Sequence, residues 1–273
     1  MTMSARCASH GAIPPPRLIS ALVFLILYSA TPGHALIQNG SPQRWDIQPT
    51  DHFDIYYQSQ QRSQVDAVAR EAERAYARIS YVLRHELAEK MPLILVREDR
   101  DLPRNEEQAR ALVTASRAPE RDHLLFSAET FEKRPESVLA HELTHQFLFE
   151  LLPQADRDAP WVSEALADHH GGLWDSSEFG KVHDALVRGS VPAVEDMAAS
   201  DRHWGHAVFD FVAAEYGAKG IRDYLAALRD GPTVRSDAIP VAFGVSTHDF
   251  NAAFQRYVRT RFADRQDSPA ARR

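Results

Sequence analysis

Cysteine is almost absent from this chain: Cys7 is the single one among 273 residues. Because a disulfide needs two thiols, no disulfide framework within the chain is possible. Cys7 also lies in the first 35 residues, which we expect to be removed, and no cysteine stands at the expected cleavage site to carry a lipid. The remaining chain must therefore be stabilised by a packed core.

Basic charge is also in short supply. The 31 lysines and arginines face 38 acidic residues, and removing Arg6 and Arg17 with the first 35 residues leaves 29 against 38, a formal charge of −9. A nucleic acid or an anionic membrane surface would attract the opposite balance. We therefore expect neither as a partner.

Long hydrophobic runs are missing as well. The apolar run from Leu18 to Ala30 has 13 residues, too few to cross a bilayer comfortably. It follows a start that carries arginines and no acidic residue, and it precedes the small residues Gly33 and Ala35, the layout of a secretory signal. We expect residues 1–35 to be cleaved, giving a secreted or periplasmic protein without stable membrane insertion. An uncleaved amino-terminal anchor is the alternative.

The rest of the chain, which contains neither repeats nor long low-complexity linkers, reads as an α+β protein in two parts. We expect an N-terminal α/β subdomain over 36–152, a helical C-terminal subdomain over 153–262 and a disordered tail over 263–273. The N-terminal part shows strand patterns at 52–58 and 93–98 and, between them, a helical spacing of apolar residues over 63–85.

Residues 99–128 are predicted to contain a charged loop or irregular helix up to 110, followed by two strands. ALVTAS (111–116) and HLLFSA (123–128) are read as a hairpin, because the RAPERD connection is polar and contains a proline. HLLFSA is either an edge strand that could pair with an extended peptide or an ordinary internal strand.

The helical part is bounded by prolines and glycines. One helix is expected from Pro135 to Pro153, and a second from about Pro160 to Gly171. Further helices end in capping glycines at 217 and 231, and the last one runs from a cap at Thr247 to Phe262.

The sequence HELTH (141–145) lies on the first of these helices. Positions i and i+4 project from one face of a helix, so His141 and His145 can direct their rings at one metal ion. Glu142 is rotated from them by about 100°, where a carboxylate can reach a water on the metal without binding the metal itself. The alternative is a pair of exposed histidines on an ordinary surface helix.

A catalytic zinc usually has three protein ligands. The metzincin pattern would place glycine and histidine where this chain has Leu148 and Leu151, so that class is excluded. Glu164 is the better third ligand, since the 18 residues after His145 allow the chain to turn and return on an antiparallel helix.

Asp168 follows Glu164 by one helical turn. It can accept a hydrogen bond from the outer ring nitrogen of a metal-bound histidine, most simply His141, and thereby orient the ring. Ala165 and Ala167 are small, so we expect the two helices to approach each other closely.

HELTH, 18 residues and then WVSEALAD resemble the gluzincin metallopeptidases, and within them the peptidase MA-like family, whose W-x-x-E-G-x-A pattern differs here at Ala165. The resemblance covers most of 50–262; its central motif is specific and its flanks are weak. It implies a thermolysin-like fold and an exported zinc metallopeptidase of peptide or protein substrates, with His141, His145 and Glu164 as ligands.

The same resemblance implies that Glu142 is the general base that takes a proton from a zinc-bound water. No G-x-M-E-N-like segment, which would hold a free amine, is present, so an endopeptidase is favoured. A catalytically silent zinc-binding scaffold or peptide-binding protein on the same fold is the alternative.

Gluzincins usually also supply a hydrogen-bond donor to the oxyanion from the helical part. Arg202, His203 and His206 lie in the corresponding stretch, and His203 is the favoured donor. Tyr216 is read as a core residue, and His169 and His170 as neighbours of the site rather than ligands.

Overall fold

The computed structural model describes residues 44–119, 123–153, 160–172, 174, 176–230 and 238–262. The expected signal segment and tail lie outside these residues, so the predictions about them stay predictions. The described strands and helices are β1 (Trp45–Pro49), β2 (Phe53–Gln58), α1 (Arg62–Leu83), β3 (Met91–Val96), α2 (Glu106–Ser116), β4 (Leu124–Ser127), α3 (Ala128–Lys133), α4 (Pro135–Leu151), α6 (Pro160–Gly171), α7 (Ser176–Val187), α8 (Arg202–Asp230), α9 (Ala238–Phe243) and α10 (Thr247–Phe262).

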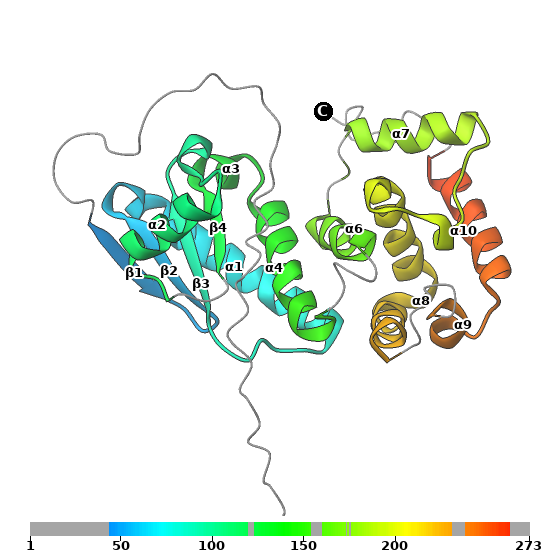
Figure 1. The fold of residues 1–273 in the computed structure, drawn as a ribbon, viewed down its shortest axis with the longest axis horizontal. Coiled ribbons are helices and arrows are strands. Elements are labelled where there is room, and N and C mark those ends of the chain that lie inside the picture. Colours follow the sequence, from blue (N-terminus) through cyan, green and yellow to red (C-terminus); the bar gives the residue numbers. More distant parts are fainter. Residues whose placement is uncertain are drawn as a thin grey trace, which may run out of the picture.

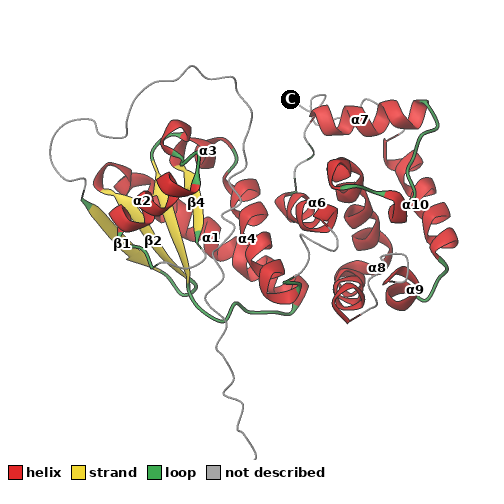
Figure 2. Ribbon diagram, viewed as in Figure 1, coloured by secondary structure: helices red, strands yellow, loops and turns green. Residues whose placement is uncertain are grey.

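The protein is α+β and mostly helical, as expected, with a small mixed sheet on one side and helices on the other (Figure 2). The strand order is β1-β2-β3-β4. β1 is antiparallel to β2, whereas β3 is parallel to both β2 and β4. β1 was not expected, because it lies in a stretch that reads as a polar lead-in.

The predicted strand at 111–116 is wrong, because these residues form the second half of α2. Ile94 of β3 and Tyr56 of β2 pack with Val113 of this helix in a small apolar cluster of their own. Their neighbours in β2 and β3 belong to the large core that contains α1 and α4. Apolar residues over 111–116 therefore face a sheet from a helix, and they do not alternate across a strand.

The hairpin prediction fails for the same reason. β4 pairs with β3, and the pairing is parallel, with Leu95 opposite Phe126. A parallel neighbour needs a crossover connection, and α2 lies in it. β4 ends the strand order, so of the two alternatives for HLLFSA the structure shows the edge strand; its pairing with a peptide stays a prediction.

The helical portion lies beyond α4, with α6 between α4 and α8 (Figure 1). α8 is interrupted at Gly217, which has φ 64° and ψ −169° and therefore divides the run into two helices, as the capping glycine predicted. α10 begins at Thr247, but its cap is Ser246, whose hydroxyl accepts a hydrogen bond from the amide of Asp249 (3.1 Å).

One large apolar core extends from Phe53 in the sheet to Phe262 at the end of α10. Both portions therefore contribute to the same buried cluster, and α4 and α6 lie where they meet. Within the described residues, no helix combines the length and the apolar character that a bilayer crossing requires.

Candidate metal centre

Helix α4 presents its two histidines beside a buried apolar face. Leu139, Leu143 and Phe147 recur at four-residue spacing and are almost fully buried, which anchors the helix against the core. His141 and His145 lie next to this face, with side chains 14% and 16% exposed. The rings are thus held on a fixed helix while one side of them remains accessible.

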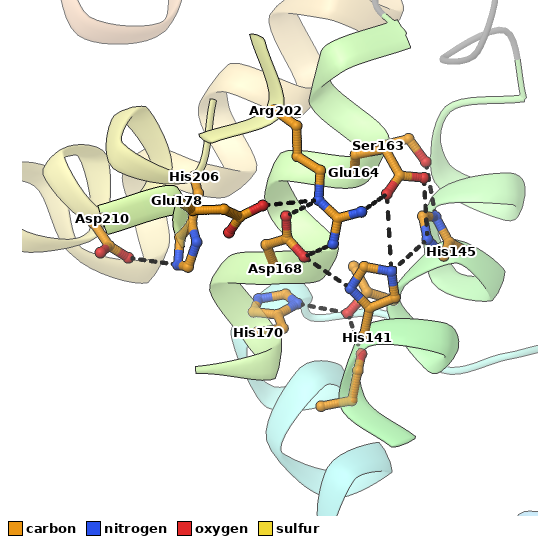
Figure 3. A network of polar contacts seen from close by, with 12 residues as sticks. His141, His145, Ser163, Glu164, Asp168, His170, Glu178, Arg202, His206 and Asp210 are labelled. Atoms are coloured by element: carbon orange, nitrogen blue, oxygen red, sulfur yellow. Dashed lines mark hydrogen bonds and ion pairs between the residues drawn. The ribbon is translucent and has the colours of Figure 1, made fainter. Parts of the chain in front are cut away.

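The histidines and Glu164 converge, as the sequence predicted (Figure 3). The two Nε2 atoms are 3.3 Å apart, Oε1 of Glu164 is 3.6 Å from Nε2 of His145, and Oε2 is 3.9 Å from Nε2 of His141. Ligand atoms on one tetrahedral zinc, at about 2.0–2.1 Å from the metal, would lie about 3.3 Å apart. The three side chains therefore have the spacing of a metal-ligand set.

Each histidine is held through its outer nitrogen. Nδ1 of His141 is 3.1 Å from Oδ1 of Asp168, the partner expected from the sequence. Nδ1 of His145 is 2.9 Å from the hydroxyl of Ser163, a partner that the sequence reading missed. With both Nδ1 atoms engaged, both Nε2 atoms point inward, as in histidines whose outer contacts fix the tautomer for metal binding.

The pKa values of the two rings are shifted in opposite directions although the rings lie side by side. Burial lowers the pKa of His141, but the hydrogen bond to Asp168 and the negative charges of Glu142 and Glu164 outweigh it and raise the pKa. Burial and the charge of His141 lower the pKa of His145 to about 3.

Burial also acts on the two glutamates. It raises the pKa of Glu164 to about 7, against the opposing charges of His141 and Arg202. Oε2 of Glu164 is buried and has no hydrogen-bond partner among the described residues. Burial likewise raises the pKa of Glu142, which favours a carboxylate that can take up a proton. Nη1 of Arg202 lies 3.3 Å from Oε2 of Glu164, and a cation bound by the three converging side chains would give this oxygen a further partner.

Arg202, at the start of α8, lies against the carboxylates of α6. Its Nε and Nη2 atoms donate to the two oxygens of Asp168, each at 2.5 Å, and its Nη1 is 3.3 Å from Oε2 of Glu164. Burial raises the pKa of Asp168, but its hydrogen bonds with His141 and Arg202 outweigh this and lower it. Asp168 is therefore an ionised link between the arginine and a candidate metal ligand.

Close packing between α6 and α8 brings Arg202 to this position. A Cβ atom added to Gly205 would lie 2.6 Å from Cβ of Ala165 and 2.8 Å from Trp161. The small size of Ala165 thus lets α8 approach α6 closely. Helix α4 also packs closely on α6, as the sequence predicted. A larger residue at position 205 would push α8 away from α6, and it would move Arg202 with it.

His203, the favoured oxyanion donor, shows no contact with His141, His145 or Glu164 among the described residues. Its ring lies 5.7 Å from that of Trp204, and burial and the charge of Lys181 lower its pKa. His206 is almost fully buried and stacks on Trp174, with ring centroids 4.1 Å apart. Of the three candidates, Arg202 is the one that contacts the site, and its helical phase could not be read from the sequence alone.

His170 and His169 make contacts outside the three converging side chains. The hydroxyl of Thr144 donates to the carbonyl of Ala140 (2.6 Å) and lies 3.0 Å from Nδ1 of His170. Nδ1 of His170 must then be the donor, which ties α6 to the helical turn between the two site histidines. His169 contacts Asp210 at 2.7 Å. These histidines support the packing around the site.

Comparison with known proteins gives no match: no family model fits the chain, and no curated protein and no solved structure is significantly similar to it. The resemblance to gluzincin peptidases therefore depends on the residues of this chain.

Proposed function

We propose that this protein is a zinc-dependent metallopeptidase of the gluzincin type, and that it hydrolyses bonds within peptide or protein substrates. The convergence of His141, His145 and Glu164 carries the proposal, because each histidine turns Nε2 inward while its Nδ1 is held by another side chain. Two imidazoles and a carboxylate are the donor set of a known class of catalytic zinc sites. The HExxH motif and its spacing to Glu164 support the choice of zinc.

Zinc in this position would lower the pKa of a water toward neutrality and polarise a substrate carbonyl. His141, His145 and Glu164 would hold the ion, and Asp168 would keep the ring of His141 oriented. Glu142, which adjoins His141 in the sequence, would accept a proton from the attacking water and deliver it to the leaving amine. The raised pKa of Glu142 suits this exchange, since a base of this kind works best when its pKa approaches the working pH.

A second candidate function is zinc-dependent peptide binding without cleavage. It is favoured by the position of His203, whose described contacts leave the donor to the oxyanion unidentified. The group closest to that role is Arg202, but two of its nitrogens are committed to Asp168. Export to a secreted or periplasmic location is also part of the proposal. It is supported by the signal-like pattern of residues 1–35.

The decisive experiment is a peptide-library digest by the protein, by Glu142→Gln and by Glu136→Gln, with bound zinc measured in parallel. Glu136 is exposed on the same helix and provides the matched control. We expect cleavage by the wild type and by Glu136→Gln that a chelator stops and added zinc restores. Glu142→Gln should retain zinc and lose at least about 100-fold in cleavage rate, the effect of a general base.

Zinc binding without cleavage by the wild type would favour the peptide-binding alternative. A wild-type protein that binds no zinc would contradict both functions.

A further inference from the structure

Arg202 is the point at which two groups of acceptors meet. On one side lies Glu164, 3.3 Å from Nη1. On the other lie both oxygens of Asp168, at 2.5 Å, and Oε1 of Glu178 from α7, 3.7 Å from Nε (Figure 3). The guanidinium therefore touches one candidate metal ligand and two carboxylates that are not ligands in the proposed centre.

Asp168, Glu178 and His206 form a second group of converging acceptors, with one atom of each within 4.8 Å of the others. The ring of His206 is 1% exposed and its Nε2 is turned toward Asp210, 3.7 Å away. Its Nδ1 is buried and has no hydrogen-bond partner among the described residues. Arg202 is a cation in contact with this group, since its Nε is 2.5 Å from Asp168 and 3.7 Å from Glu178.

Glu164 and Asp168 are alternative partners for the two-pronged edge of the Arg202 guanidinium, and the structure pairs that edge with Asp168. An arginine that paired fully with Glu164 would occupy the carboxylate needed for the metal, because a two-pronged pair with a carboxylate is the strongest contact a guanidinium makes. The Nε–Nη2 edge is instead taken by Asp168, with Glu178 beside Nε. Glu164 receives only the single, longer contact from Nη1.

We propose that Glu178 is a positioning residue of the metal centre: it holds the Nε–Nη2 edge of Arg202 on Asp168, so that Glu164 receives only the single contact from Nη1. This inference rests on the proposed zinc site and adds a fourth helix, α7, to the elements that maintain it. The chain of contacts runs from Glu178 to Arg202, from Arg202 to Asp168, and from Asp168 to Nδ1 of His141.

The test is a double-mutant cycle on zinc affinity, measured by competition with a chromogenic chelator. The proteins are wild type, Glu178→Gln, Arg202→Gln, the double variant, and Glu215→Gln as the control, since Glu215 is exposed on α8. We expect Glu178→Gln to weaken zinc binding by about three- to tenfold, less than the 10- to 100-fold typical of direct outer partners of a ligand. Glu215→Gln should change it by less than about twofold.

The cycle distinguishes an effect of Glu178 through the position of Arg202 from a direct effect of the Glu178 charge on the metal. If Glu178 acts through Arg202, Glu178→Gln has less than about a twofold effect once Arg202 is glutamine. Should Arg202→Gln fail to fold, Arg202→Lys is the second background, because lysine keeps the charge without the two-pronged contact.

An equal effect of Glu178→Gln in both backgrounds, or none in the wild type, overturns the inference while leaving the zinc site intact. Two zinc ions per wild-type chain, with one lost in Glu178→Gln, also overturn it, because a metal would then take the place of Arg202. Absence of zinc from the wild type removes the proposed function and this inference together.

Discussion

Two histidine–aspartate pairs lie in neighbouring parts of this molecule, and their surroundings differ. In the first, Nδ1 of His141 is 3.1 Å from Asp168, and in the second, Nε2 of His206 is 3.7 Å from Asp210. Each histidine also lies close to further carboxylates: His141 to Glu164, and His206 to Asp168 and Glu178. The residue types are the same, so the difference between the pairs must come from what lies around them.

A guanidinium contacts the first pair directly, because Arg202 donates to both oxygens of Asp168. The same arginine also contacts Glu164 at 3.3 Å and Glu178 at 3.7 Å, and Glu178 is a member of the group that includes His206. Burial lowers the pKa of His206 to about 4, whereas the carboxylates around His141 raise its pKa. A histidine–aspartate pair therefore indicates a metal site when the histidine also converges with further ligand side chains, as His141 does with His145 and Glu164.

The sharpest way to break this comparison is to remove each histidine. His141→Ala should weaken zinc binding by more than about 100-fold, beyond the loss expected for an outer partner. His206→Gln should weaken it by less than about threefold, because no ligand is removed. Equilibrium competition with a chelator measures both, and equal losses would show that the two pairs are not distinct in the way proposed.

The aspartates give a smaller and more specific effect. Asp168→Asn should weaken zinc binding by about 10- to 100-fold, because the amide no longer holds the ring of His141 as a carboxylate does. Asp210→Asn, which disturbs the contacts to His169 and Trp174, should change zinc affinity by less than about threefold. Zinc affinity that falls equally in the two variants would argue for a general effect of buried charge.

The smallest expected effect is on stability, and it concerns the contact of Gly205 in α8 with Ala165 and Trp161 in α6. Gly205→Ala should lower the free energy of unfolding by about 1–3 kcal/mol, because its methyl group would collide with Ala165 and Trp161. The control is Gly180→Ala on α7, where nothing lies within 4 Å and alanine should stabilise the helix by about 0.5–1 kcal/mol. Urea denaturation measures both, and a neutral Gly205→Ala would mean that the two helices can separate at little cost.

Spacing within single helices made much of the site predictable. His141 and His145, four residues apart, and Glu164 and Asp168, also four apart, had to share faces, and the prolines bounded their helices. The distance between Arg202 and His203 is a single residue, about 100° around the helix. Which of them turns toward α6 depends on where α8 starts and on the close contact at Gly205, and neither could be read from the sequence.

The sheet was harder to predict, because short apolar segments fit a helix or a strand equally well. Residues 111–116 carry Leu112 and Val113 on a helix that packs on the sheet face opposite α1. Their apolar character was clear from the sequence, but their period was not. The partner of a strand is a tertiary property, so the parallel pairing of β4 could not be read from a polar connection.

Gly217 gives α8 a double attachment. The first half carries Arg202, and the second half extends to Arg222, whose Nη1 donates to the carbonyl of Val82 at the end of α1 (2.7 Å). With φ 64° and ψ −169°, this bend is open almost exclusively to glycine. The segment 202–230 therefore connects the helical portion to α1 of the sheet-bearing portion. An inserted residue beside Gly217 would rotate the half of α8 that carries Arg202 relative to the half that carries Arg222. A change at Gly217 would therefore be felt at Arg202.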